Sequence, residues 1–328
     1  MAPVTGLGTT YNLPNYTGIL YQLTPADTPF FSAIGGLTGG GQTDSIEFEW
    51  QTFDLRAAGQ NVALEGADAP SGSERVRSNV SNLVQIQHET VEVSYTKLAA
   101  VQAKAGVNNA ERNPVTNEAD WQIEQMLKQM VRDIEYSFIQ GTYNKPADNT
   151  GKRQTRGILS AITTNAIAAP DDDGAGAGTT GLLTEELVLD LMQSVWENGG
   201  IQESDTATLL CNAFQKRMLT DIFITKKNYQ EMSRTVGGVR VQTVETDFGT
   251  LNLMLDRHMP ADQVALVSLE QCMPVFQEIP GKGHFFAEPL ARTGATDRTQ
   301  LYGEVGLQYG NEKAHGKITN LSTALPAA

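Results

Sequence analysis

The chain has 328 residues, of which 40% are hydrophobic, so it can bury a substantial core, while its 31 glycines argue against a plain helical bundle. Its formal net charge of −14 excludes a protein that grips nucleic acid through a general basic surface, although it allows one that encloses nucleic acid without gripping it.

Residues 1–43 are predicted to form an N-terminal arm. Prolines, glycines and threonines are interspersed with aromatic residues, and the segment contains neither lysine nor arginine. Such a segment cannot bury its aromatic side chains by itself, so we expect it to lie on another surface; a plain flexible terminus is the alternative. The aromatic residues are Tyr11, Tyr16, Tyr21, Phe30 and Phe31.

Residues 44–97 have the pattern of an extended β-hairpin loop. Apolar and polar residues alternate from Ile46 to Trp50 and again in a return strand, on either side of a small and polar tip at 57–81. The alternation changes parity between His88 and Thr90, which predicts a bulge or a break there. A two-stranded ribbon of this length is only marginally stable alone, so we expect another molecule to cover it.

The best-defined element is an amphipathic helix predicted over residues 117–139. It contains no glycine or proline, and Thr116 or Asn117 can cap its first turn. Apolar residues at steps of three and four form one face, and charged residues are predicted on the opposite face. The apolar residues are Ile123, Leu127, Met130, Val131, Ile134 and Phe138, and the charged ones are Glu124, Lys128, Asp133 and Glu135.

A polar, glycine-rich loop at 168–181 marks a domain boundary, and residues 182–274 are predicted to form a compact α+β domain. A helix should begin at Thr184 and stop at Gly199 and Gly200. Its apolar face is assigned to Leu187, Leu191, Val195 and Trp196. The other predicted elements are a helix at 213–223 and strands near 206–210, 239–241, 251–255 and 264–269.

Strand periodicity returns in residues 275–328, where apolar and small residues alternate with polar ones from Leu301 to Tyr309. We expect these late strands to lie beside the helix of residues 117–139 and to complete the domain that residues 98–181 begin. The domain of residues 182–274 is then an insertion, and the predicted fold class is α+β.

No catalytic, cofactor-binding or metal-binding residues are predicted. Gly36–Thr43 is close to a phosphate-binding loop, but Gln42 replaces the required lysine and a strand pattern follows in place of a helix. Asp171–Asp173 would need a carboxylate at position 182 to form a calcium loop, and Leu182 is there; a solvated acidic loop is predicted, with a weak cation site as the alternative. The histidines have no metal-ligand spacing: His88, His258, His284 and His315.

Two cysteines, Cys211 and Cys272, are too few for a disulfide framework and are predicted to be small buried thiols. No apolar run is long enough to cross a bilayer and no signal peptide opens the chain. We therefore expect a soluble protein made in a reducing cytoplasm, with no membrane partner.

The order of these parts resembles the major capsid protein of tailed bacteriophages with the Hong Kong 97 fold. The chain is most similar to the phage SU-ten-like major capsid group, although none of the short motifs is specific alone and their order carries the resemblance. The motifs are Asp27–Phe30, Thr246–Gly249, Leu290–Gly294, Glu304 and Ala314–Gly316.

The resemblance implies a role for each part of the chain. The arm would reach neighbouring subunits, the extended loop of residues 44–97 would lie over an adjacent subunit, and the helix of residues 117–139 would be the spine of a peripheral domain. The peripheral domain would comprise residues 98–181 and 275–328. Residues 182–274 would form the axial domain, which meets its copies around five-fold and six-fold axes.

The function that the resemblance implies is self-assembly, as hexamers and pentamers, into an icosahedral shell around double-stranded DNA. The protein would be part of the virion, assembled in the host cytoplasm, and its partners would include portal, scaffolding and decoration proteins. DNA would be enclosed without sequence-specific binding. The alternatives are the shell protein of an encapsulin-like cellular compartment and, more remotely, a soluble enzyme with a dispersed active site.

Two departures from the family pattern lead to further expectations. The chain has no lysine before Lys97, so covalent crosslinking through a lysine of the extended loop is not expected. It also lacks the long N-terminal extension that some relatives use as a built-in scaffold and later cleave. We therefore expect either a separate scaffolding protein or assembly without one.

Overall fold

The computed structural model describes residues 26–99, 117–148, 150–170, 180–201, 207–226, 232–236, 239–292 and 294–323. Tyr11, Tyr16 and Tyr21 of the predicted arm and the acidic residues Asp171–Asp173 lie outside the described residues. The chain divides into two compact units. The first is Met1–Ala26, His88–Met130 and Ala287–Leu301, and the second is Asp27–Gln87, Val131–Phe286 and Tyr302–Ala328.

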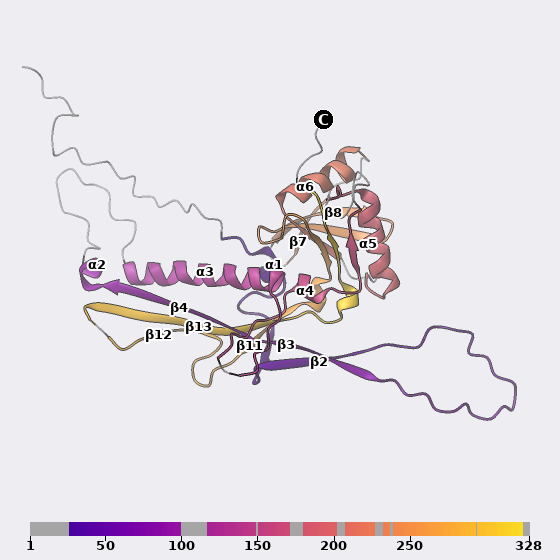
Figure 1. Cartoon of the computed structure of the whole chain (residues 1–328), viewed down its shortest axis with the longest axis horizontal. Coiled ribbons are helices and arrows are strands. Elements are labelled where there is room, and N and C mark those ends of the chain that lie inside the picture. The colour runs from indigo at the N-terminus through magenta and orange to yellow at the C-terminus, as the bar shows by residue number, and fades with distance from the viewer. Residues whose placement is uncertain are drawn as a thin grey trace, which may run out of the picture. The chain divides into compact units, whose positions relative to one another are not determined.

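Helices and strands alternate irregularly along the chain (Figure 1). The helices are α1 (Pro29–Ala33), α2 (Tyr95–Ala99), α3 (Glu118–Gln140), α4 (Ile158–Ala161), α5 (Glu185–Glu197) and α6 (Ala213–Leu219), with a π-helix η1 (Thr220–Lys226) and 3₁₀ helices η2 (Leu269–Gln271) and η3 (Glu312–Ala314). The strands up to the centre of the chain are β1 (Gly41–Thr43), β2 (Glu47–Phe53), β3 (Arg77–Leu83), β4 (Gln85–Ser94), β5 (Ala166–Ala168), β6 (Ala207–Cys211) and β7 (Met232–Val236). The later strands are β8 (Val239–Thr246), β9 (Gly249–Leu255), β10 (Val264–Val267), β11 (Met273–Gln277), β12 (Phe285–Pro289), β13 (Thr296–Gln308) and β14 (Gly316–Thr319).

The helix predicted over residues 117–139 is confirmed as α3, and Asn117 caps it. The Oδ1 atom of Asn117 accepts a hydrogen bond from the backbone N–H of Ala119 at 3.1 Å. Met130, Ile134 and Phe138 are buried, as the apolar face requires.

The assignment of Glu135 to the solvent-facing side of this helix is wrong, because its side chain is fully buried. Its carboxylate accepts hydrogen bonds from the backbone N–H groups of Phe30 and Phe31 in α1. Those donors at the first turn of a helix have no partner within the helix itself, so a carboxylate is a favourable acceptor for them. The partners of the buried Glu135 carboxylate, Phe30 and Phe31, are thus more than a hundred positions away in the sequence.

A seven-stranded sheet has the order β5-β14-β10-β6-β9-β8-β7. Its central strand β6 is buried at every residue and pairs with β9 in parallel and with β10 in antiparallel orientation. Helix α5 packs against β5 and β14, and α6 packs against β9. The strands predicted within residues 182–274 are confirmed as β6, β8, β9 and β10. The sheet also recruits β5 and β14 from outside that range, and β7 was not predicted.

Helix α5 begins as predicted, because the Thr184 hydroxyl accepts a hydrogen bond from the Leu187 backbone N–H at 3.3 Å. Leu187, Leu191 and Val195 are buried, but Trp196 is 57% exposed, so its assignment to the apolar face is wrong. Successive residues of an α-helix are separated by about 100° around its axis. Trp196 is therefore turned away from the buried stripe on which Val195 lies.

The second sheet has the path β1-β11-β13-β12, with β4 also paired to β13, while β2 and β3 form a separate two-stranded ribbon. The return strand predicted for the hairpin is thus divided at Val84, where β3 ends in the ribbon and β4 begins in the larger sheet. The predicted break between His88 and Thr90 is wrong, because β4 continues through both residues. The backbone N–H of Val84 still donates to the carbonyl of Ile46, in register with the ribbon, and its side chain is buried in a cluster with Phe48. The strand that follows, β4, pairs with β13 instead.

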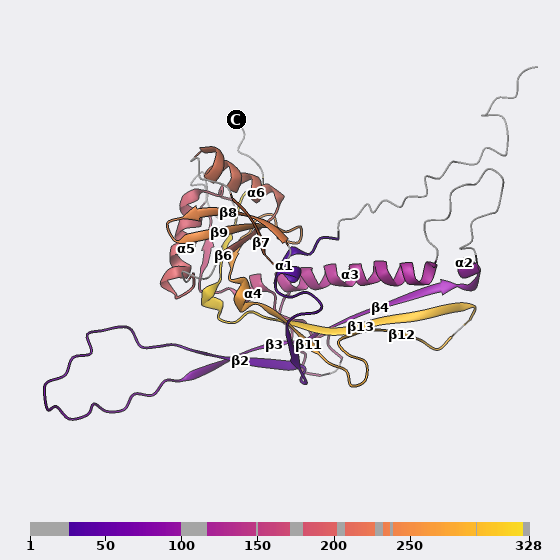
Figure 2. The same cartoon turned by 180° about the vertical axis from the view of Figure 1, so that it is seen from behind.

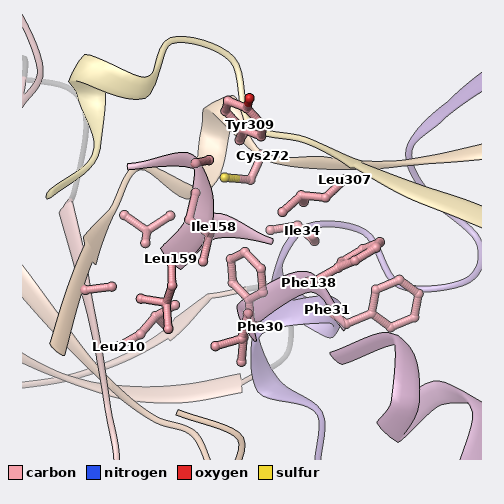
Figure 3. Close-up of a cluster of buried hydrophobic side chains, with 14 of the residues drawn as sticks. Phe30, Phe31, Ile34, Phe138, Ile158, Leu159, Leu210, Cys272, Leu307 and Tyr309 are labelled. Atoms are coloured by element: carbon pink, nitrogen blue, oxygen red, sulfur yellow. The ribbon is translucent and has the colours of Figure 1, made fainter. Parts of the chain in front are cut away.

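A hydrophobic core forms around Phe30 and Phe31, the residues predicted to lie in the arm (Figure 3). Both are buried, and Phe31 packs edge-on against Phe138 of α3 with ring centroids 5.7 Å apart. The expectation that the arm and the hairpin lack cover within the chain is therefore wrong for these residues and for Phe48, which is 8% exposed. Pro29 begins the short helix α1 and directs both rings into the core.

Helix α3 is too polar to cross a membrane, and none of the helices in the described residues has the length and apolarity that a membrane span requires.

Candidate functional site

Exposed apolar side chains are concentrated at the end of the β2–β3 ribbon and in the segment that connects the two strands. We name this connecting segment, residues 54–76, the apolar loop. Figure 2 shows this loop continuing beyond the ends of β2 and β3. The exposed side chains are Phe53 (65%), Leu55 (76%), Val62 (82%), Leu64 (85%) and Val76 (77%). Exposed apolar side chains gathered on one segment are typical of a surface that contacts another molecule.

The ribbon that carries the apolar loop is firmly anchored at its base. The indole N–H of Trp50 donates to the carbonyl of Gly310 at 2.6 Å, and the ring lies edge-on to Tyr309 with centroids 5.0 Å apart. The buried Asn82 amide donates to the carbonyl of Leu307 at 2.6 Å and accepts from the backbone N–H of Arg156 at 2.8 Å. The loop is therefore presented on a fixed stem.

A cavity of about 780 Å³ lies beside the end of the ribbon from which the apolar loop leaves, and Thr52, Phe53, Val76 and Ser78 are among its lining residues. Its two cationic side chains already have partners. The Arg156 guanidinium lies 4.5 Å from the Tyr143 ring centroid and donates to the Tyr309 hydroxyl at 3.1 Å. The Lys313 ammonium lies 3.4 Å from a carboxylate oxygen of Asp54. The cavity thus offers an irregular polar surface rather than a preformed site for an anion.

The last three of the residues that resembled a phosphate-binding loop are in a strand, and residues 36–40 form the turn before it. Gly41, Gln42 and Thr43 form β1, which pairs in parallel with β11, so their backbone is in a sheet ladder rather than a phosphate cradle. Among the described residues, no group of three or more His, Cys, Asp or Glu side chains could hold a metal ion. The absence of catalytic, cofactor and metal sites stays a prediction.

The two cysteines are free and buried, which confirms their predicted state. Burial raises the pKa of the Cys211 thiol to about 12, and burial also raises the pKa of Cys272 well above its usual range. Both thiols therefore stay protonated and unreactive at neutral pH.

Several residues that carry the family resemblance have structural roles. Gly249 has a φ of +114° at the turn between β8 and β9, a conformation that favours glycine. Glu304 forms a largely buried ion pair with Arg153. A Cβ atom at Gly316 would lie 2.7 Å from a side-chain carbon of Leu191, so glycine allows α5 to pack closely on β14. These motif residues therefore contribute to maintaining the fold.

His315, in the same group of motifs, is buried and held in its neutral form. Its Nε2 lies 2.7 Å from the carbonyl oxygen of Tyr309, and its Nδ1 accepts from the backbone N–H of Ser268 at 3.2 Å. Burial lowers the pKa of His315 to about 4, against the opposing influence of the Tyr309 carbonyl and the Glu312 charge. Protonation at Nδ1 would break the bond to Ser268.

This geometry predicts a contribution to stability that is lost in acid. Between pH 6.5 and about 4 the unfolded chain binds a proton at His315 that the folded chain does not, so the stability falls as the pH falls. We expect a loss of about 1.4 kcal/mol per pH unit in this window relative to His315→Gln, which cannot titrate. Urea unfolding of both proteins over this range measures the difference; identical pH profiles would contradict the assignment.

Residues 3–322 match the family model for the SU10 major capsid protein. This chain belongs to the SU10 major capsid protein family. The major capsid protein of Escherichia phage Phieco32 is 22% identical over 343 residues, which cover 90% of each chain. The chain is thus a major capsid protein of a tailed phage, a viral structural protein, as the sequence predicted.

Solved structures share the fold of this major capsid protein. The cyanophage A-1(L) capsid subunit matches with a TM-score of 0.62 at 12% identity, covering 98% of this chain and 100% of that one. The capsid of Myoviridae phage XM1 matches with a TM-score of 0.60 at 14% identity, covering 95% and 98%. The holo-SrpI encapsulin of Synechococcus elongatus PCC 7942 matches with a TM-score of 0.60 at 12% identity, covering 100% and 99%. The fold alone thus does not separate phage capsids from encapsulins, whereas the family match does.

The sequence predicted a loop between the two strands of the hairpin, but its description of residues 57–81 as small and polar missed the exposed apolar side chains of Val62, Leu64 and Val76. It also missed the burial of Glu135 and of Asp256, which are both 0% exposed. The helical period of α3 placed Glu135 among charged residues, and Asp256 directly follows β9 without a distinctive motif. The backbone amides that Glu135 binds have no signal in a hydrophobic pattern.

Proposed function

We propose that many copies of this major capsid protein assemble, as hexamers and pentamers, into an icosahedral shell that encloses double-stranded DNA. The observation that carries this proposal is the apolar loop, whose exposed side chains have no cover within the described part of their own chain. A second copy of the same chain is the occupant that the family implies, because a major capsid protein is present in many copies. Covering these side chains would remove apolar surface from water at every subunit contact.

In this proposal the other parts of the chain have the roles that the sequence resemblance implied. The apolar loop lies over an adjacent subunit, α3 is the spine of a peripheral domain, and residues 182–274 form an axial domain at the five-fold and six-fold axes. The N-terminal arm reaches neighbouring subunits. The anchored base of the ribbon supports the first of these roles, because it fixes the direction in which the loop leaves the core.

The proposal also covers the partners of the shell. Portal, scaffolding and decoration proteins would join it in the host cytoplasm, and DNA would be enclosed without sequence-specific contacts, which agrees with a net charge of −14. Covalent crosslinking through the loop is not part of the mechanism, since the first lysine of the chain is Lys97. Membership of a structural protein family supports a role without enzymatic activity.

Sedimentation velocity and negative-stain microscopy of the purified full-length chain test the assembly. We expect capsomers or closed shells as the protein concentration rises. A species of 35.5 kDa that stays monomeric at every concentration would contradict the proposal.

An encapsulin-like compartment is the second candidate, favoured by the fold shared with the holo-SrpI encapsulin. The contents of purified particles distinguish the two. Nuclease-protected double-stranded DNA supports the phage shell, whereas particles that hold a defined enzyme and no DNA support the compartment.

A further inference from the structure

Two buried carboxyl groups meet beneath α1. Glu135 of α3 and Asp256, the residue after β9, are both completely buried and lie within hydrogen-bond reach of each other. Glu135 Oε1 accepts from the Phe30 backbone N–H at 2.8 Å, and Oε2 accepts from that of Phe31 at 2.6 Å. The Glu135 carboxyl group thus joins the first turn of α1 to α3.

One of the two carboxyl oxygens of Asp256 has no N–H or O–H hydrogen-bond donor among the described residues. Asp256 Oδ1 accepts from the backbone N–H of His258 at 2.7 Å, but Oδ2 receives no N–H or O–H hydrogen bond from the described residues. A buried carboxyl oxygen in this state is costly unless a proton lies on it or is shared with it. The neighbouring Glu135 is the group that can share one.

Arg257, the residue that follows Asp256, has a different carboxylate partner. Arg257 is exposed and forms an ion pair with Asp27 at 2.9 Å, which provides a second link between the start of α1 and the end of β9. The titratable and charged groups around the pair are Cys211 of β6, Lys216 of α6, Arg257 and His258 after β9, Asp27 before α1, and Arg132, Asp133 and Tyr136 on α3.

We propose that Glu135 and Asp256 share one proton at neutral pH and that this proton fastens the Asp27–Ala33 segment to the core. Without the proton, two negative charges would be buried side by side, and each would disfavour the other. The pair is therefore a proton-dependent fastening for the Asp27–Ala33 segment.

The direction of the pH dependence follows from the titration of the pair. Burial, together with the hydrogen bond and the charge of Asp256, raises the pKa of Glu135 to about 10, although the amides of Phe31 and Phe30 oppose this rise. We call the state fastened when the Asp27–Ala33 segment is bound to Glu135, and opened when it is detached. At pH values between 4.5, the ordinary pKa of a glutamate, and about 10, the fastened state keeps a proton on the pair that the opened state releases. The fastening is therefore strongest in mild acid, weakens as the pH rises, and changes no further above pH 10.

Hydrogen–deuterium exchange of the full-length protein tests the proposal through a peptide that covers Asp27–Ala33. In the wild-type protein, the protection of this peptide, corrected for the intrinsic exchange rate, should fall by about tenfold per pH unit as the pH rises towards 10. Asp256→Asn removes the neighbouring charge and supplies an amide donor to Glu135, so the pKa of Glu135 should fall and the loss of protection should end at a lower pH than in the wild-type protein. A wild-type protein without this dependence, or an Asp256→Asn protein whose dependence is identical to it, would overturn the proposal.

Two further variants test whether the pH dependence of this protection comes from Glu135. Glu135→Gln removes the titrating proton, but its amide leaves one of the two α1 N–H groups without an acceptor, so we expect weaker protection at every pH. Glu124→Gln changes an exposed carboxylate on the same helix that pairs with Lys128, and it should leave the wild-type pH dependence unchanged. If Glu124→Gln abolishes the dependence, the pair is not its source.

Infrared spectroscopy of the wild-type protein gives a readout that does not depend on a variant folding. A protonated carboxylic acid has a C=O stretching band that a carboxylate lacks. We expect this band at neutral pH, its loss as the pH passes about 10, and its loss at a lower pH in folded Asp256→Asn. No such band in the neutral wild-type protein would contradict the shared proton.

Discussion

Replacement of Ile134 by aspartate should prevent the chain from folding and therefore from assembling. Ile134 is 0% exposed and belongs to the same core cluster as Phe30, Phe138 and Leu307. The substitution removes about 1.5–3 kcal/mol of apolar burial and places an unpaired charge in the core at a further cost of several kcal/mol. Together these losses are comparable to the entire stability of a typical domain, about 5–15 kcal/mol.

Circular dichroism during thermal unfolding measures this effect, and Ile134→Val is the matched control. We expect no cooperative transition for Ile134→Asp and a loss of about 0.5–1.5 kcal/mol for Ile134→Val. Leu127 is only half-buried, so Leu127→Asp should be milder than Ile134→Asp, although both lie on the predicted apolar face. A soluble Ile134→Asp protein that assembles normally would mean that this core is wrongly assigned.

Substitution of four apolar loop residues by serine should abolish assembly while leaving the subunit folded. The residues are Leu55, Val62, Leu64 and Val76, and each is at least 76% exposed within its own chain. Their loss should change the free energy of unfolding by less than about 0.5 kcal/mol per site, because exposed positions contribute little to folding. If a neighbouring copy covers them, each removes about 1.5–3 kcal/mol from the subunit contact, which is a large loss when repeated at every contact in a shell.

Unfolding curves and particle yield should both be measured for the wild-type protein and for the four-serine variant. Asp68→Ser, a polar change on the same loop, is the matched control and should retain wild-type assembly. Assembly of the four-serine protein at wild-type yield would show that the apolar loop is not an intersubunit contact. A lower unfolding temperature for that protein would instead show that the loop stabilises its own subunit.

The elements that the sequence predicts correctly are those whose buried residues are determined by neighbours in the sequence. The spacing of Met130, Ile134 and Phe138 defines α3, and the Thr184 cap defines the start of α5. Each signal depends on residues within one or two helical turns, where the 3.6-residue period and capping chemistry operate. The resemblance of ordered motifs, rather than any single motif, then points to the capsid family.

The features that the sequence could not predict depend on distant partners. Glu135 is buried because its carboxylate binds the amides of Phe30 and Phe31. The ribbon ends near Val84 because the next strand, β4, pairs with β13. Hydrophobic periodicity carries no information about such partners, so it placed Glu135 in solvent and continued the ribbon too far.

The central claim is that the apolar loop of one copy binds a neighbouring copy in a closed shell. A cryo-electron microscopy reconstruction of the assembled particle at side-chain resolution tests it directly. We predict that Leu55, Val62, Leu64 and Val76 of each subunit are buried against the adjacent subunit. A shell in which residues 54–76 contact only their own chain, or project into solvent, would contradict the account.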